Sequence, residues 1–229
     1  MSTIDRRRLL IASTTLGLLG ALGATRRAWA LTDEEKLVEE CRLSVESLLS
    51  DEDFKWLGDY IHRARGVAVF PALIKGGFIL GAEGGTGVLL ARLADNSWSY
   101  PAFYFLGAAS IGLQIGGQVS EVVLTIMNDA SVDRILLNNF KLGADASMAV
   151  GPVGAAAEAG TTGSFDSDIY TFGSAVGLFG GVSLEGAVLS GEPKRNKYYY
   201  GVEASSREVV RENKVSNSQA DPLRKALPV

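Results

Sequence analysis

The sequence predicts an α+β protein: a strongly curved, Gly-rich antiparallel β-sheet, as a half barrel or sandwich, with N-terminal helices and one inserted helix packed on it. Three observations predict this fold. Helical periodicity is confined to residues 33–63 and to a segment after Asn128. Short apolar segments separated by turn residues dominate from Gly66 onward. Of the 27 glycines, 22 lie between Gly66 and Gly191, where they allow bulges and sharp strand coiling.

Residues 1–30 have the pattern of an export signal. Arg6-Arg7-Arg8 precedes an apolar run, and Ala28-Trp29-Ala30 has the A-x-A form of a cleavage site. Arginines followed by two leucines resemble the twin-arginine signal, so we expect cleavage near Ala30 and a periplasmic or secreted protein. The alternative is an uncleaved N-terminal anchor.

Two helices are expected at the start of the mature chain. Thr32 and Glu35 have the spacing of a capping box. Apolar residues then recur at helical spacing, at Leu37, Cys41, Val45 and Leu48. Cys41 therefore falls on the buried stripe, as a small core residue. A second helix is predicted from Ser50, and it ends near Gly66.

The central part of the chain predicts strands. Val67–Pro71 is typical of a short buried strand stopped by proline. Further strands are predicted at 77–83, 86–92, 111–118, 119–127, 143–150, 153–160, 168–175, 177–182 and 183–189. Asn128 can begin the inserted helix. Residues 204–229 are polar and contain two prolines, which predicts a loosely ordered tail.

Membrane helices are the alternative to curved strands. The triplets Gly77, Gly81, Gly85 and Gly173, Gly177, Gly181 have the small-residue spacing of packed membrane helices. Residues 96–120 also contain no charge. That window is nevertheless rich in Asn, Ser, Gln and Gly, which makes it a poor membrane span. We therefore favour strands.

The composition excludes several kinds of catalytic site. A single Cys and a single His (His62) allow no internal disulfide, no structural zinc site and no paired-His metal centre. Gly81–Gly87 fits no phosphate-binding motif and is typical of a hairpin turn. Ser110 lies in a weak nucleophile-elbow pattern, and Asp166 with Asp168 offers only two metal ligands. We expect a protein that is not an enzyme, with no cofactor and no metal.

Basic residues indicate a different kind of site. Without residues 1–30 the chain has 17 basic and 25 acidic residues, a net charge of −8, which argues against nucleic acid as a partner. Local basic residues beside aromatic ones suit a phosphorylated headgroup at an interface. The candidate headgroup-binding residues are Arg63, Arg65, Lys75, Lys194, Arg195 and Lys197, and the candidate membrane-interface residues are Tyr198, Tyr199 and Tyr200. Ordinary solvated surface charge is the alternative.

The order of glycine motifs resembles the SYLF domain family. The motifs are Gly66–Pro71, Lys75–Phe78, Gly84–Leu89, Trp98 with Pro101, Ser110–Gly116, Leu142–Asp145, Gly151–Gly154, Gly177–Gly186 and Tyr200-Gly201. The resemblance covers about residues 36–203. It implies a lipid-binding module: eukaryotic members bind phosphoinositide membranes and some act on actin, whereas bacterial members are exported and bind phospholipid. The sequence departs from the family at Phe172–Val176, which lacks the usual basic residue.

These observations together predict an exported domain over residues 31–203, followed by the tail. We expect it to bind phospholipid or anionic lipid headgroups by peripheral contact at the bacterial cell envelope, with no role in actin binding. One alternative is a structural envelope protein that docks a protein partner or self-assembles. Another is a hydrolase that works through Ser110 or His62.

Overall fold

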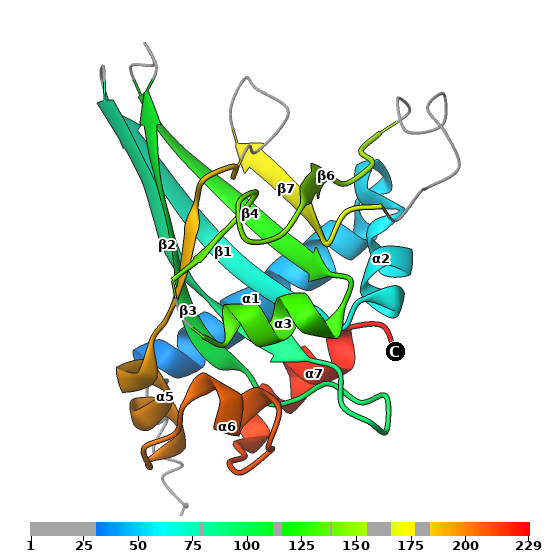
Figure 1. Cartoon of the computed structure of the whole chain (residues 1–229), viewed down its shortest axis with the longest axis vertical. Coiled ribbons are helices and arrows are strands. Elements are labelled where there is room, and N and C mark those ends of the chain that lie inside the picture. The colour runs from blue at the N-terminus through cyan, green and yellow to red at the C-terminus, as the bar shows by residue number, and fades with distance from the viewer. Residues whose placement is uncertain (1–30, 78–79, 112–115, 138, 155–165, 177–183) are drawn as a thin grey trace, which may run out of the picture. The chain divides into compact units, whose positions relative to one another are not determined.

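The computed structural model describes residues 31–77, 80–111, 116–137, 139–154, 166–176 and 184–229. The export signal, the strand predicted at 177–182 and most of the strand predicted at 153–160 lie outside these residues. The described part has the predicted α+β class, an eight-stranded curled sheet with helices packed on it (Figure 1).

Both N-terminal helices form, but the second begins at Leu57 and not at Ser50, because Ser50 still belongs to the first helix. Helix α1 spans Asp33–Ser50, a 3-10 turn spans Glu52–Phe54, and α2 spans Leu57–Arg63. The capping box is present: the Thr32 hydroxyl accepts from the Glu35 N–H at 3.2 Å, and the Glu35 carboxylate accepts from the Thr32 N–H at 2.8 Å. Both contacts satisfy donors that the first turn leaves open. The inserted helix α3 spans Asp129–Ile135 and is capped by Asn128.

The sheet has the strand order β5-β8-β3-β2-β1-β4-β7-β6. Its strands are β1 Gly66–Gly77, β2 Leu80–Ala91, β3 Ala102–Ile111, β4 Gly116–Ile126, β5 Phe140–Lys141, β6 Met148–Val150, β7 Ile169–Val176 and β8 Val188–Gly191. Neighbouring strands are antiparallel, except that β6 pairs with β7 in parallel. The four long strands β3, β2, β1 and β4 form its centre.

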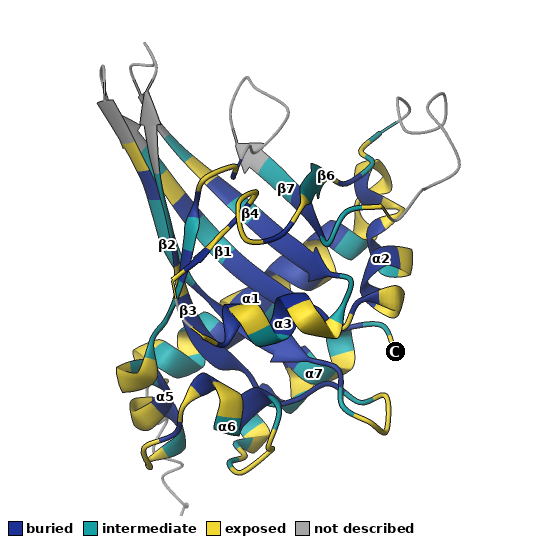
Figure 2. Cartoon of the chain, viewed as in Figure 1, coloured by how far each residue is buried: buried dark blue, intermediate teal, exposed yellow. Residues whose placement is uncertain are grey.

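Side chains alternate between two apolar layers, one on each face of the sheet. Ala68 and Phe70 of β1 belong to a core shared with α3 and β8, on what we call the inner face. Val67 and Val69 belong to a core shared with α1, α2 and the C-terminal helix, on the outer face. Figure 1 shows α3 and α1 on opposite sides of the sheet, and Figure 2 shows the buried strand segments between them. The sheet is therefore covered on both faces along the half that begins at Gly66.

Several strand predictions were wrong in extent. The chain continues as β4 across the boundary predicted between 118 and 119, and the strands predicted at 143–150 and 183–189 are observed only as β6 and β8. Pro71 does not end β1, because it lies at an irregularity in register between Val69 and Ile74, where a missing N–H is tolerated. The segments 77–83 and 86–92 are one strand, β2, because the glycines between them continue the ladder instead of turning. Strand β3 was not predicted, because its apolar residues do not alternate with polar ones.

Close approach of backbones explains two of the strand glycines. A β-carbon on Gly87 would lie 2.1 Å from the carbonyl oxygen of Val69, and one on Gly85 would lie 2.2 Å from that of Ala72. Both positions of β2 therefore admit only hydrogen. Gly77, Gly81 and Gly85 lie on strands, as expected from the curved-sheet interpretation. Within the described ranges, no helix is long and apolar enough to cross a membrane.

The expectation of a loosely ordered tail was wrong. After α5 (Pro193–Tyr200) the chain forms α6 (Ser206–Val210), a 3-10 turn at Ser218–Ala220 and α7 (Asp221–Ala226). Sparse apolar residues anchor them: Val209 and Val210 are fully buried against the inner face, and Leu223 is 1% exposed in the outer core. The prediction failed because the segment is mostly polar, and the few apolar residues that hold it against the sheet are widely spaced.

Candidate functional site

The predicted basic and aromatic residues 194–200 lie on helix α5, which the sequence did not reveal as a helix. Pro193 stands in its first turn, and Gly201 ends it with φ of 74°. Arg195 pairs with Glu34 at 3.1 Å and with Glu192 at 3.5 Å. Lys197 pairs with Glu203 at 2.8 Å. Arg195 and Lys197 are therefore both engaged in ion pairs within the protein, whereas the third basic residue of the helix, Lys194, is exposed.

The three tyrosines of α5 do not form one surface. Tyr198 is 74% exposed, whereas Tyr199 is only 6% exposed. The Tyr199 hydroxyl lies 2.6 Å from Gln219 Oε1, and the half-buried Tyr200 donates to the Pro101 carbonyl at 2.6 Å. Desolvation raises the pKa of both phenols. The prediction of a membrane-interface row is therefore corrected: only Tyr198 is available at the surface.

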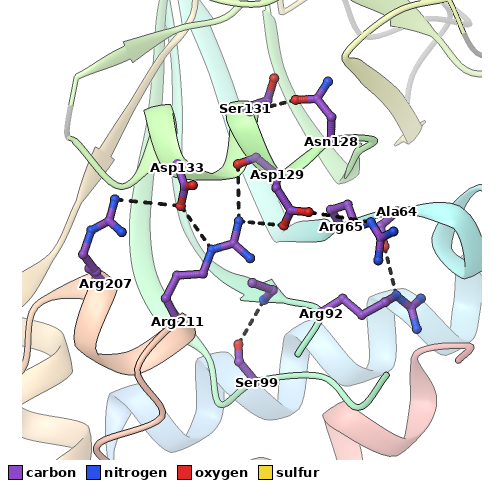
Figure 3. Close-up of polar contacts among 11 residues, drawn as sticks. Ala64, Arg65, Arg92, Ser99, Asn128, Asp129, Ser131, Asp133, Arg207 and Arg211 are labelled. Atoms are coloured by element: carbon purple, nitrogen blue, oxygen red, sulfur yellow. Dashed lines mark hydrogen bonds and ion pairs between the residues drawn. The ribbon is translucent and has the colours of Figure 1, made fainter. Parts of the chain in front are cut away.

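Arg65 belongs to an ion-pair network that joins α3 to α6 (Figure 3). Its Nε lies 3.8 Å from the Asp129 carboxylate. Arg211 bridges Asp129 at 2.9 Å and Asp133 at 3.2 Å, and Arg207 approaches Asp133 at 3.8 Å. Three guanidinium groups thus share two carboxylates. This arrangement holds the C-terminal segment to the inserted helix.

Lys75 lies on the inner face near the Gly77 end of β1. It stands directly opposite Glu83 of β2 on one side and Gln118 of β4 on the other. The Gln118 amide donates to Ser120 at 3.2 Å. Burial raises the pKa of Glu83, and the nearby Lys75 charge partly offsets this increase. A cation, a carboxylate and an amide therefore lie side by side on three strands.

The six predicted basic residues are not brought together. Arg63 ends α2 and Arg65 immediately precedes β1, whereas Lys75 lies nine residues along that strand, roughly 30 Å away at strand rise. Helix α5 follows β8, and Glu192 there donates to the Phe103 carbonyl, toward the Ala102 end of β3. Lys75 therefore lies alone among the predicted cations at the Gly77 end of the sheet.

An exposed apolar strip lies at that same end, on the outer face. Ile74 is 62% exposed, Val119 47% and Phe105 41%. Ile74 pairs directly with Val119 and with Gly84. The Phe105 ring lies across Gly84 and Gly107, 2.8 Å from where a β-carbon on either would be. These side chains, which we call the outer strip, therefore form a row across β4, β1, β2 and β3.

The outer strip was missed from the sequence. The irregularity in β1 decides which face Ile74 occupies, and β3 was not predicted at all. One signal was present: Phe105 is followed at two residues by Gly107, a spacing at which a strand places both on one face.

The other candidate chemistries are not assembled. His62 lies at the end of α2, with Nδ1 2.7 Å from a main-chain oxygen of Val229. Ser110 pairs with Gly81 toward the opposite end of the sheet. Asp168 accepts hydrogen bonds from Asn128 and Ser147, which lower its pKa and give it a structural role. No group of three metal-ligating side chains was found among the residues that the structure describes.

Comparison with known proteins places the chain in a family. A family model described as "Ysc84: Las17-binding protein actin regulator" matches residues 107–228, more than half of the chain. This chain belongs to the SYLF (Ysc84) family. The match runs from β3 through α7, so the packed C-terminal helices are part of the SYLF domain.

Several curated proteins are similar to this chain. SH3 domain-containing YSC84-like protein 1 of Rattus norvegicus is 36% identical over 141 residues, 61% of this chain and 41% of the relative. SH3 domain-containing protein PJ696.02 of Schizosaccharomyces pombe is 32% identical over 167 residues, which are 72% of this chain and 39% of the relative. Protein YSC84 of Saccharomyces cerevisiae is 30% identical over 170 residues, which are 73% of this chain and 36% of the relative. The chain thus spans less than half the length of these relatives.

Proposed function

We propose that this SYLF domain is a non-enzymatic lipid-binding module that meets a phospholipid membrane with the Gly77 end of its sheet. The outer strip is the observation that carries the proposal. Ile74, Phe105 and Val119 are more than 40% exposed in one row, whereas α1 covers the neighbouring apolar side chains of the same face. Contiguous exposed apolar surface is typical of a binding site.

The chemistry of this end suits the boundary between headgroups and acyl chains. Full burial of one such side chain contributes about 1.5–3 kcal/mol. Lys75 lies on the opposite face of the same strand segment as Ile74. A membrane surface at this end would therefore meet apolar side chains and a cation together. The proposal moves the headgroup contact from α5, where two cations are already paired, to Lys75.

Vesicle co-sedimentation tests the proposal. The double variant Ile74→Ser/Val119→Ser should weaken binding to phospholipid vesicles at least about tenfold, which corresponds to about 1.4 kcal/mol. Leu137→Ser is the matched control, because Leu137 is 72% exposed just after α3 and lies outside the strip. Equal binding by the double variant and the parent, with both proteins folded, would refute the proposed contact.

We also propose export to the bacterial cell envelope, on the pattern of residues 1–30. Fractionation of a bacterial host that expresses the full chain should recover a shortened protein outside the cytoplasm. Replacement of Arg6, Arg7 and Arg8 by Lys should retain the longer precursor in the cytoplasm. Export of this variant at the parent's level would exclude a twin-arginine route.

Protein docking on the same strip is a second candidate. It is favoured by the description of the matching family model, which names a Las17-binding actin regulator. Co-sedimentation with actin filaments, with the parent and with Ile74→Ser/Val119→Ser, tests it. Strip-dependent capture by filaments without vesicle binding would favour a protein partner over lipid.

A further inference from the structure

Three polar side chains form a row on the inner face, directly across three adjacent strands. Glu83 of β2, Lys75 of β1 and Gln118 of β4 are neighbours in register. Below the row toward Gly66, the same face is apolar, with Leu73 and Leu106 fully buried. The row thus marks the boundary of the apolar inner-face core, on the side away from Gly66.

Glu83 is the unusual member of this row. It is only 8% exposed. Its carboxylate accepts no hydrogen bond and lies within 4.0 Å of no basic nitrogen among the residues that the structure describes, although Lys75 is near enough to influence its charge. Its oxygens are not among the fully buried polar atoms that lack a partner, so they reach solvent at the edge of a largely buried side chain. The carboxylate can therefore accept hydrogen bonds from the donor of a bound ligand.

We propose that Lys75 and Glu83 form a subsite for a zwitterionic ligand of phosphoethanolamine chemistry. Its primary ammonium donates to Glu83, and its phosphate is bound by Lys75. This inference rests on the proposed lipid function and deepens it, since it names the headgroup class.

The alternation of charge argues for a zwitterion. A simple anion drawn to Lys75 would be repelled by Glu83, and a simple cation would meet the reverse problem. Directly opposed residues have β-carbons about 4.5–5.5 Å apart, so one small ligand can reach both charges. The Gln118 amide, which uses one N–H on Ser120, keeps a second N–H for the phosphate.

The Glu83 carboxylate should distinguish a primary ammonium group from a quaternary one. A primary ammonium has three N–H donors and can satisfy the carboxylate directly. A quaternary ammonium, as in choline, has none and would displace water from the carboxylate without replacing the hydrogen bonds that the water makes. The subsite should therefore prefer ethanolamine phosphate over choline phosphate.

Binding to vesicles of defined composition tests the headgroup. We expect the full chain to bind phosphatidylcholine vesicles at least fivefold more tightly when phosphatidylethanolamine is included. Lys75→Gln and Glu83→Gln should each remove this preference while the proteins remain folded by circular dichroism. Lys194→Gln, which changes an exposed lysine on α5, is the matched control and should keep it. Measurable binding that is equal for both vesicle types, or a preference that survives in Glu83→Gln, would overturn the inference.

A soluble competitor separates a lipid from a free headgroup. Glycerophosphoethanolamine titrated by calorimetry should bind the parent and not Glu83→Gln if the headgroup alone suffices, whereas glycerophosphocholine should not bind. Preference for ethanolamine vesicles without binding of the soluble compound assigns the membrane lipid. Absence of both effects overturns the subsite, even where the outer strip still supports vesicle binding. Conversely, the parent protein could bind neither vesicle type and still bind glycerophosphoethanolamine selectively. That result would overturn only the membrane proposal.

Discussion

The guanidinium of Arg92 lies over the indole ring of Trp98, with Cζ 4.3 Å from the ring centroid. It also donates to the carbonyls of Ile61 at 2.9 Å and Ala64 at 3.0 Å (Figure 3 shows the latter contact). The Trp98 indole N–H donates to Pro228 at 3.0 Å. One buried cation thus ties the end of α2 to the end of β2 and to the C-terminal segment.

Arg92→Met should therefore destabilise the protein strongly. The substitution preserves much of the stem but removes the buried hydrogen bonds that Arg92 donates to the carbonyls of Ile61 and Ala64, at roughly 1–3 kcal/mol each before relaxation. We expect a total loss of about 3 kcal/mol or more in the free energy of unfolding, measured by urea denaturation. Lys225→Met on α7, at an exposed position, is the control and should change stability by less than about 0.5 kcal/mol. A small effect at Arg92 would show that water replaces its hydrogen bonds.

Two glycines should respond to alanine in opposite ways. Gly87→Ala would place a methyl group 2.1 Å from the Val69 carbonyl oxygen and 2.5 Å from the Phe70 ring, so the strands must separate. We expect a loss of several kcal/mol or failure to fold. Gly58→Ala, on α2, meets only Leu49 at 3.8 Å and should stabilise by about 0.4–1 kcal/mol. Thermal unfolding of both variants checks the pair, and equal effects would contradict it.

The same glycines show what the sequence could predict of the fold. A glycine excess between Gly66 and Gly191 predicts a curled sheet because glycine permits bulges, sharp strand coiling and close backbone approach, and the close approach is observed at Gly87. Strand ends were not predictable in the same way. Pro71 should stop a regular strand, but the irregularity of β1 depends on pairing with β2 and β4, which local sequence does not contain.

The candidate site was less predictable than the fold. Basic residues can be seen in a sequence, but their partners cannot: Glu34 lies 161 residues from Arg195, and Glu203 follows Lys197 after a helix end. Lys75 was singled out for its charge alone. Its neighbours Glu83 and Gln118 depend on the register of three strands, which follows from tertiary pairing.

Glu83→Gln should stabilise the protein at neutral pH and above. Burial raises the folded-state pKa of Glu83, so ionisation costs stability as pH rises through that pKa. The cost is absent below the unfolded pKa, roughly 4.3, because both states are then protonated. We expect a higher Tm for the variant at pH 8 and no difference near pH 4. Glu40→Gln, an exposed position on α1, should show no such pH dependence. A lower Tm for Glu83→Gln at pH 8 would show that Lys75 stabilises the carboxylate more than burial destabilises it.

A substitution at Leu223 tests whether α7 unfolds together with the sheet. Its side chain is 1% exposed in the outer core, against the layer that contains Val38, Val45 and Leu57. Leu223→Ala should therefore cost about 2–5 kcal/mol through lost burial and a residual cavity. Leu43→Ala is the matched control, because Leu43 is 50% exposed on α1, and it should cost little.

The measurement is urea denaturation followed by both tryptophan fluorescence and circular dichroism. A single shifted transition for Leu223→Ala is expected, since one apolar layer joins α7 to the sheet. A separate early transition would instead mean that α7 unfolds independently of the sheet.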